Sequence, residues 1–512
     1  MVRVMTRLGC SVVLLSLGVL SCSGRRLVAD SGVDGSLSGA AGQAGAAGGA
    51  GGSSTPSGGS GGGPSGAGGG PGGSSSGSGG SAAGGGAVGG AAASRGGTGG
   101  AAGGAAAGKG GGSGGAGGAA VPNDAAAEGG APDAAVDRAE TVSCRPTFVP
   151  VDAPSPATGQ FANGVAIADL NRDGKPDVVT VNRDDKTVSV LLGIGDGRFQ
   201  AKVDYATGPS PNALAIGDLD RDGTPDVVVA NRSGPSLRVL RGTGQGKLTA
   251  GVDYAAANGP WALALADLNG DGKLDVVAVN QSAGMSVWLG SGDGKLGAEV
   301  SNETSSSPLS LAIADVNADR KPDVVVTGWS GTVAVHIGKG DGTFAAKAEY
   351  TTGIFPLAIA AGDLDGTGGL DVVTINANSN SDGSRADTLR VLLSTADGKL
   401  AAGGEYPVGR HDQTDSPYMY GSSPVSVVLA DVNGDGKQDA IVVNDTSATI
   451  SVLLGMGDGT FAAKVDYATG RQPLSLAAGD LNGDGRVDLA VTISDVTNSD
   501  GTLAVFLNTC GQ

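Results

Sequence analysis

A nine-residue acidic pattern recurs seven times in this chain, and its spacing constrains the fold more than any other feature. The pattern reads D-x-[ND]-x-D-G-x-x-D, and successive copies start 49, 49, 48, 48, 68 and 49 residues apart. A fixed period of this length indicates a repeat architecture in which each copy belongs to one structural unit. We call the copies acidic loops 1 to 7; they span residues 169–177, 218–226, 267–275, 315–323, 363–371, 431–439 and 480–488.

Each acidic loop carries the oxygen groups that a hard cation binds. Side-chain oxygens stand at positions 1, 3, 5 and 9, position 7 can add a backbone carbonyl, and a glycine at position 6 permits a sharp bend. Ca²⁺ takes about six to eight oxygens in tolerant geometry, whereas Mg²⁺ demands a stricter octahedron and is the second choice. The alternative is that Asp, Asn and Gly simply form tight turns. Five copies nevertheless keep all four side-chain ligands and the glycine in register.

We therefore predict up to seven structural Ca²⁺ sites, with the residues at position 7 binding through their backbone carbonyls. The predicted ligands are Asp169, Asn171, Asp173, Lys175, Asp177, Asp218, Asp220, Asp222, Thr224, Asp226, Asp267, Asn269, Asp271, Lys273, Asp275, Asp315, Asn317, Asp319, Lys321, Asp323, Asp363, Asp365, Gly369, Asp371, Asp431, Asn433, Asp435, Lys437, Asp439, Asp480, Asn482, Asp484, Arg486 and Asp488. Loops 4 and 5 are expected to be the weaker sites. Arg320 replaces the bend glycine of loop 4, and Thr367 replaces a carboxylate of loop 5.

The residues around each loop predict four short strands per repeat. Residues 213–217 and 262–266 alternate large and small side chains with period two before a loop, and β-branched runs such as 177–182 follow one. A third strand such as 188–192 ends in a glycine turn, and a fourth strand such as 461–467 comes after that turn. Four antiparallel strands repeated seven times predict an all-β, seven-bladed β-propeller.

With this order of loops and strands, residues 148–511 resemble the FG-GAP/VCBS repeat family, whose members include the integrin alpha-subunit propellers. The resemblance implies a propeller with calcium in such loops. The seventh repeat stops after its third strand, residues 503–507, and residues 147–152 look like the missing fourth strand, with Phe148 two residues early. Cys144 and Cys510 would then form a disulfide that replaces the missing turn and closes the ring. Two unpaired thiols are the alternative.

The N-terminal 141 residues predict export and a tether. Arg3 and Arg7 precede a mainly apolar run, residues 8–20, that is too short to span a bilayer. Residues 19–22 resemble the lipobox of bacterial lipoproteins, which implies a signal peptide at 1–21, an acylated Cys22 and outer-membrane sorting. An ordinary secretory signal with an incidental cysteine is the alternative. Residues 22–141 are rich in Gly, Ala and Ser, and we expect a disordered linker ahead of the propeller at 142–512.

The charge and composition of the chain favour some classes of function over others. A net charge of −18, from 51 acidic and 33 basic residues, argues against nucleic acid as a partner. The chain has only two histidines, His336 and His411, and carries no familiar hydrolase or zinc-protease motif. We therefore expect a binding or adhesion module for an extracellular or envelope glycan or a protein. A carbohydrate-active lyase or hydrolase is the alternative.

The expected ligand-binding residues lie on the rim of the propeller away from the acidic loops. Two insertions in the fifth repeat and one in the seventh fall there, and loops on a rigid scaffold commonly carry recognition. The candidates are His411, Tyr418, Tyr420 and Trp329. The alternative is that these loops only cover blade edges. We expect Trp261, His336 and the recurrent tyrosines at 205, 254, 350, 406 and 467 to be packed residues.

Overall fold

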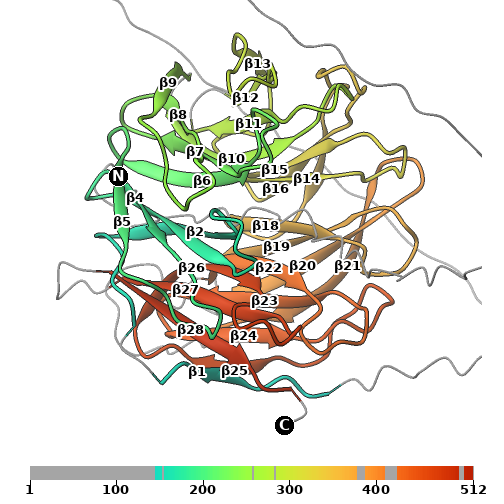
Figure 1. The fold of residues 1–512 in the computed structure, drawn as a ribbon. Coiled ribbons are helices and arrows are strands. Elements are labelled where there is room, and N and C mark those ends of the chain that lie inside the picture. The colour runs from blue at the N-terminus through green and yellow to red at the C-terminus, as the bar shows by residue number, and fades with distance from the viewer. Residues whose placement is uncertain are drawn as a thin grey trace, which may run out of the picture. The chain divides into compact units, whose positions relative to one another are not determined.

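The computed structural model describes residues 144–152, 155–256, 259–281, 284–377, 387–409, 424–494 and 501–510. These residues form seven four-stranded antiparallel sheets arranged in a ring, which is the predicted seven-bladed β-propeller (Figure 1). In every blade the first strand lies innermost, and it contacts the first strand of the next blade. Contact between β2 (Ala162–Ala168) and β26 (Gln472–Gly479) completes the ring. Within the described residues, no helix is long and apolar enough to cross a membrane.

Blades 1 to 6 each take four consecutive strands. Blade 1 contains β2, β3 (Asp177–Asn182), β4 (Thr187–Leu191) and β5 (Val203–Ala206). Blade 2 contains β6 (Pro211–Gly217), β7 (Asp226–Asn231), β8 (Ser236–Leu240) and β9 (Val252–Ala255). Blade 3 contains β10 (Pro260–Ala266), β11 (Asp275–Asn280), β12 (Gly284–Trp288) and β13 (Val300–Asn302).

The second half of the ring repeats this order. Blade 4 contains β14 (Pro308–Ala314), β15 (Asp323–Gly328), β16 (Thr332–His336) and β17 (Ala348–Thr351). Blade 5 contains β18 (Pro356–Gly362), β19 (Asp371–Ala377), β20 (Asp387–Ser394) and β21 (Leu400–Pro407). Blade 6 contains β22 (Pro424–Ala430), β23 (Asp439–Asn444), β24 (Thr449–Leu453) and β25 (Val465–Ala468). Blade 7 contains β26, β27 (Asp488–Ser494), β28 (Thr502–Asn508) and β1 (Phe148–Pro150).

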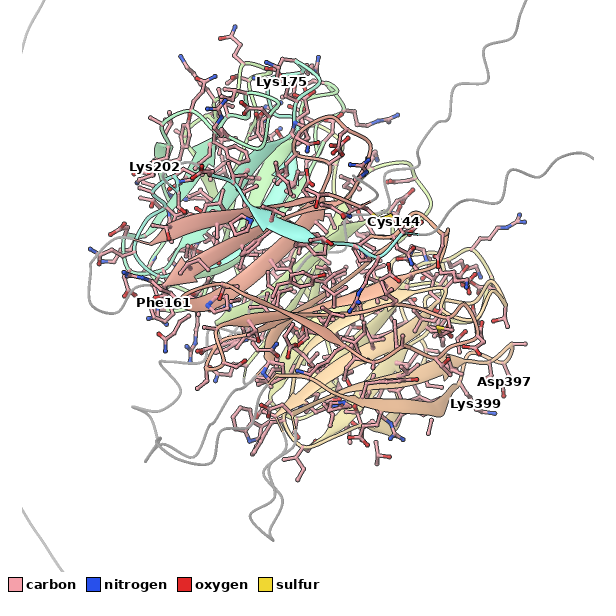
Figure 2. All side chains as sticks on the ribbon, turned by 90° about the horizontal axis from the view of Figure 1, so that it is seen from below. Cys144, Phe161, Lys175, Lys202, Asp397 and Lys399 are labelled. Carbon is pink, nitrogen blue, oxygen red and sulfur yellow. A yellow bond between two sulfur atoms is a disulfide. The ribbon has the colours of Figure 1, made fainter. Side chains whose placement is uncertain are left out.

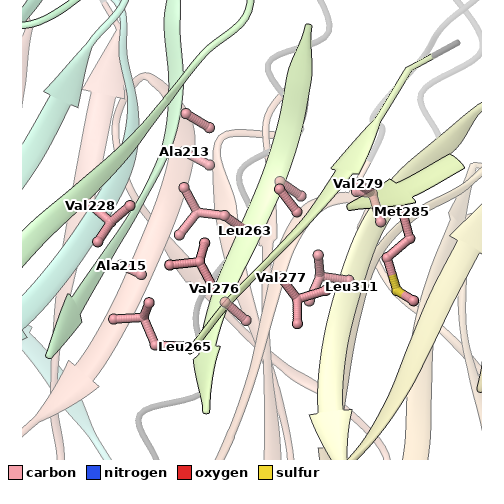
Figure 3. Close-up of a cluster of buried hydrophobic side chains, with 14 of the residues drawn as sticks. Ala213, Ala215, Val228, Leu263, Leu265, Val276, Val277, Val279, Met285 and Leu311 are labelled. Atoms are coloured by element: carbon pink, nitrogen blue, oxygen red, sulfur yellow. The ribbon is translucent and has the colours of Figure 1, made fainter. Parts of the chain in front are cut away.

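The apolar core lies between neighbouring blades. The second strands are β-branched runs that are buried along their whole length, because each blade has a neighbour on both faces. Figure 3 shows this for blade 3: Val276 of β11 lies on the side of blade 2, and Val277 lies beside Leu311 of blade 4. Trp261 is 2% exposed in the same cluster, as predicted. The recurrent tyrosines are half-buried against the clusters of their own blades, also as predicted.

The missing fourth strand of blade 7 is β1, as the sequence predicted. β1 pairs with β28 in the register Phe148↔Asn508, Val149↔Leu507 and Pro150↔Phe506. Cys144 and Cys510 are joined as a disulfide with their Cα atoms 5.6 Å apart. The Phe148 ring packs edge-on against Tyr467 of blade 6 at 5.3 Å, and Phe461 packs in the same way on Tyr406 of blade 5. Phe148 therefore takes the place of the repeat phenylalanine despite its shifted sequence position.

The fourth strands are shorter than predicted. β25 begins at Val465, and Phe461 forms only an isolated bridge with Gly455. The residues between them follow the glycine turn without joining the sheet. β21 of blade 5 is the exception among the outer strands, because it pairs with β20 almost to the turn, from Leu400↔Ser394 to Pro407↔Thr388.

Each innermost strand also contains a bulge near its start. The pairing register of β2 with β3 shifts between Ala162 and Gly164, and a shift of the same kind occurs near the start of the other six innermost strands. A bulge bends its strand and increases the local twist. The period-two pattern therefore holds only after the bulge in each innermost strand.

Antiparallel pairing places all seven acidic loops on one rim, because each loop joins the first strand of a blade to the second. The glycine turns join the third strand to the fourth, so they share this acidic rim. In Figure 2, Lys175, Cys144 and Asp397 lie along one side of the propeller, and Phe161 lies on the other side. The strand ends that flank residues 378–386, 410–423 and 495–500 are on this opposite rim.

Candidate functional site

The acidic loops share one hydrogen-bonded geometry. In loop 1 the Asp169 carboxylate accepts the backbone N–H of Asp173 at 3.2 Å and that of Gly174 at 2.9 Å. The side-chain oxygen of Asn171 accepts the same Asp173 N–H at 3.0 Å. The Asp173 carboxylate then accepts the Lys175 N–H at 2.9 Å. Loops 2, 3, 4, 6 and 7 repeat these bonds, so positions 1, 3 and 5 point their oxygens toward the inside of the turn.

The carboxylate at position 9 ties each loop to the third strand of its blade. Asp177 is fully buried; one of its oxygens accepts the Leu170 N–H at 2.9 Å, and the other accepts the Gly193 N–H at 2.8 Å. The corresponding aspartates of loops 2 to 7 make the same two kinds of bond. Sequence reasoning assigned this position only a ligand role and missed its structural one.

The close approach of the third strand explains the glycine at Gly193. A Cβ there would lie 2.1 Å from the backbone oxygen of Pro176. The same short approach recurs at Gly242, Gly290, Gly338 and Gly455. A glycine two residues after the end of the third strand is therefore the sequence signal for this clamp in five of the seven blades.

Burial raises the pKa of the position 9 carboxyl groups. For Asp177 burial raises the pKa to about 6; the two backbone N–H donors oppose the shift, and the charges of Asp169 and Asp173 add to it. The pKa is also raised to about 6, with burial the largest cause, for Asp226, Asp323, Asp439 and Asp488. It is raised for Asp275 and Asp371 for the same reason. These carboxyl groups therefore hold their protons to a higher pH than an exposed aspartate does, and a nearby positive charge would favour their ionised form.

Two positions of each loop have left-handed backbone. Position 6 has φ between 77° and 87° at its glycines, such as Gly174 at 78°, and Arg320 has φ 66° in loop 4, as the sequence predicted. Position 4 is left-handed as well, which sequence reasoning missed: Arg172, Arg221 and Ala318 have φ of 60°, 63° and 56°. The signal was present, because the other four loops have glycine at position 4.

The chemistry of the donors fits a divalent cation in every loop, and their spacing fits one in loops 2 and 5. Asp218, Asp220 and Asp222 of loop 2 bring one oxygen each within 4.8 Å of one another, and Asp363, Asp365 and Asp371 of loop 5 do the same. Oxygens that share a Ca²⁺ at 2.3–2.6 Å can be up to about 5.2 Å apart, so this spread is compatible with one ion. The sequence predicts weaker Ca²⁺ binding by loops 4 and 5 than by the other loops, and this stays a prediction.

The candidate residues of the opposite rim are only partly described. Trp329 follows β15 on this rim, where its half-buried ring packs on Phe355 with ring centres 4.6 Å apart. Phe355 itself has φ 52°, and Phe161 at the start of blade 1 has φ 56° with the Arg183 guanidinium 3.8 Å from its ring centre. The other candidates, His411, Tyr418 and Tyr420, lie outside the described residues, as do Cys22, the signal segment and the tether.

His336 is a packed residue, as predicted. It is 2% exposed at the end of β16, and its Nε2 lies 2.8 Å from the Thr304 hydroxyl oxygen. Burial lowers the pKa of His336 to about 4; the charge of Lys347 lowers it further, and that of Glu349 opposes the shift. The imidazole is therefore neutral in the folded protein at physiological pH.

Comparison with solved structures finds chains of low sequence identity. A BBS1N chain crystallised with ARL6DN and soaked with lead is 12% identical over 72% of this chain and 97% of its own, with a TM-score of 0.48. An Agrocybe aegerita lectin that recognises non-reducing terminal N-acetylglucosamine is 19% identical over 70% and 93%, with a TM-score of 0.41. A 6-phosphogluconolactonase-like protein from Bacteroides uniformis is 17% identical over 62% and 89%, with a TM-score of 0.46. Comparison with curated proteins finds no match.

Comparison with protein families matches the FG-GAP-like repeat five times. The matches cover residues 169–229, 218–278, 267–326, 315–374 and 431–491, and between them they include all seven acidic loops. Each match runs from the start of one acidic loop through the next loop and into the strand that follows it. The unmatched gap at 375–430 coincides with the long fifth repeat. The chain therefore belongs to the FG-GAP-like repeat family.

Proposed function

We propose that this protein is an exported, lipid-anchored, calcium-binding β-propeller that acts as a binding or adhesion module for an extracellular or envelope glycan or a protein. The observation that carries the proposal is the difference between the two rims. The acidic rim repeats one loop geometry seven times, whereas all three long insertions leave the sheets on the opposite rim. A uniform rim suits a structural ion, and a varied rim suits recognition.

Calcium has a structural role in this proposal. Each loop joins two strands of a blade, and its position 9 carboxylate also holds the end of the third strand. A bound Ca²⁺ supplies the positive charge that the clustered carboxylates need. At free Ca²⁺ one hundred times the dissociation constant, each independent site stabilises the fold by about 2.7 kcal/mol.

Calorimetry of the full chain tests the metal part of this proposal. We expect chelation with EGTA to lower the melting temperature sharply and excess Ca²⁺ to restore it. Asp271→Asn, which removes one carboxylate from loop 3, should reduce the gain on adding Ca²⁺, whereas Asp293→Asn in the neighbouring glycine turn should not. A melting transition that is the same with and without chelator would contradict a structural role for calcium.

Binding screens of the full chain test the recognition part. We expect a hit on a glycan array or a panel of envelope proteins, and we expect deletion of residues 412–422 to abolish that binding while the melting temperature stays unchanged. If the deletion variant still binds, residues 412–422 are not needed for recognition. Product analysis of any glycan hit separates binding from the alternative, a carbohydrate-active lyase or hydrolase.

Membrane fractionation tests the anchor. Cys22→Ala should move the protein from the membrane fraction to the soluble fraction, because one acylated residue holds the chain to the bilayer. A variant that stays with the membrane contradicts the lipoprotein assignment.

A further inference from the structure

Acidic loop 2 differs from the other six by one carboxylate. It has four carboxylates, Asp218, Asp220, Asp222 and Asp226, whereas every other loop has three. The extra carboxylate is Asp220 at position 3, where five of the loops have asparagine. Loop 5 also has an aspartate at this position, Asp365, but it lacks the carboxylate at position 5.

A single arginine faces this extra carboxylate. The Arg241 guanidinium forms an ion pair with Asp220, whose side chain is only 5% exposed. Arg241 directly follows β8 and precedes Gly242, the glycine whose N–H donates to Asp226. The corresponding residue of every other blade is apolar: Leu192, Leu289, Ile337, Leu393, Leu454 and Leu507. The one basic residue in this seven-fold position therefore stands in the one blade that has a fourth carboxylate.

The stem of Arg241 occupies the place that leucine takes in other blades. A Cβ added to Gly294, in the glycine turn of blade 3, would lie 2.9 Å from Arg241 Nε. In the same way, a Cβ at Gly342 would meet Leu289 at 2.9 Å, and one at Gly459 would meet Leu393 at 2.8 Å. A leucine at position 241 is thus compatible with the packing of the ring, and the packing alone does not require the charge of Arg241.

A second guanidinium reaches loop 2 from the neighbouring loop. Arg172 of loop 1 donates to the Asp222 backbone oxygen at 2.7 Å and to the Thr224 hydroxyl at 2.6 Å, and it lies 3.7 Å from the Asp222 carboxylate. Thr224 is at position 7, where five of the other loops have lysine or arginine. Arg172 thus places beside Asp222 the positive charge that position 7 lacks, and in the described part of the chain Arg241 is the basic residue paired with the extra carboxylate.

We propose that Arg241 sets the divalent-cation affinity of acidic loop 2, because its guanidinium competes with the cation for Asp220. The inference rests on the calcium binding proposed above and assigns a residue outside the loop to the control of one site. Replacing Arg241 with leucine leaves four carboxylates without their built-in counter-charge. A guanidinium paired with Asp220 occupies one of the ligands and repels a divalent ion, so the Ca²⁺ affinity of the loop should rise by about tenfold or more when Arg241 is replaced.

Hydrogen exchange measured loop by loop tests the proposal. We expect Arg241→Leu to lower the Ca²⁺ concentration at which peptides covering residues 218–226 become protected by about tenfold, with the midpoint for residues 267–275 unchanged. Asp220→Asn added to Arg241→Leu recreates the carboxylate pattern of loop 3 and should return the midpoint of loop 2 toward that of loop 3. A loop 2 midpoint that stays the same or rises in Arg241→Leu, while loop 3 still responds to Ca²⁺, overturns the proposal alone. No response of either loop in any variant overturns the proposed calcium binding as well.

Melting in chelator checks that the effect is electrostatic. Without a divalent ion, Arg241→Leu should lower the melting temperature, because the nearly buried Asp220 loses its partner. Asp220→Asn in the same background should restore most of the loss. Failure of Asp220→Asn to restore it means that Arg241 acts through packing and counts against the proposal.

Discussion

At the scale of single residues, the acidic loops depend on backbone conformation as much as on oxygen ligands. Positions 4 and 6 are left-handed in all seven loops; glycine fills ten of those fourteen positions, and the other four are Arg172, Arg221, Ala318 and Arg320. A side chain in this region costs about 1–2 kcal/mol. The loops with such side chains therefore carry strain that the others avoid.

Arg320→Gly should relieve that strain in loop 4. We expect the free energy of unfolding to rise by about 0.5–1 kcal/mol, because the gain in φ freedom exceeds the entropy cost of glycine in the unfolded chain. Urea denaturation in chelator measures it. Lys321→Gly is the matched control and should be destabilising, since Lys321 has no positive φ and pairs with Asp319 at 3.7 Å. Equal effects of the two changes would contradict the strain argument.

His336 should make the propeller less stable in acid. Its folded pKa of about 4 lies below the ordinary value of 6.5, so as the pH falls the unfolded chain binds a proton before the native state does. The free energy of unfolding should then drop by up to about 3 kcal/mol between pH 6.5 and pH 4. His336→Leu places the residue found at this strand position in blades 1 and 2, Leu191 and Leu240, and should remove that part of the pH dependence. If the free energy of unfolding of the wild type and of His336→Leu depends on pH in the same way, His336 does not contribute to the acid sensitivity.

At the scale of elements, the position 9 aspartate connects three parts of one blade. Asp275 begins β11, accepts the Leu268 N–H of loop 3 at 2.9 Å, and accepts the Gly290 N–H after β12 at 2.7 Å. Asp275→Ala leaves both buried donors without an acceptor, and we expect a loss of about 2–4 kcal/mol in urea denaturation with chelator present. The exposed Asp293, replaced in the same way, should have little effect on the free energy of unfolding. Similar losses for the two variants would show that the clamp does not hold the blade.

At the scale of the whole molecule, the ring is closed by pairing between the two ends of the propeller. β1 completes blade 7, the Cys144–Cys510 disulfide lies beside it, and the Cys144 N–H donates to Asn433 of loop 6 at 3.4 Å. Asn508 Nδ2 also donates to the Val432 backbone oxygen at 2.7 Å. The closure therefore joins blade 7 to blade 6 as well as to itself.

Loss of the disulfide should destabilise this closure. The bond links residues 366 positions apart, and the chain-entropy model gives about 6 kcal/mol for a loop of this size. We expect the Cys144→Ser, Cys510→Ser double variant to melt at a lower temperature and its β1 amides to exchange faster. Reduced wild type should behave like the double variant. An unchanged melting temperature would show that strand pairing alone closes the ring.

The sequence by itself determined the number of blades, the order of strands and the rim that carries the acidic loops. These follow from local patterns, since the period counts the repeats and antiparallel pairing assigns the loops to one rim. It also located the closing strand and paired Cys144 with Cys510. Only the tertiary structure showed that Asp177 and its equivalents clamp the third strand, because their partners lie 15 to 23 residues away and depend on the close approach of that strand's end. The pairing of Arg241 with Asp220 likewise needed the fold, since 21 residues of chain separate two charges that the blade brings into contact.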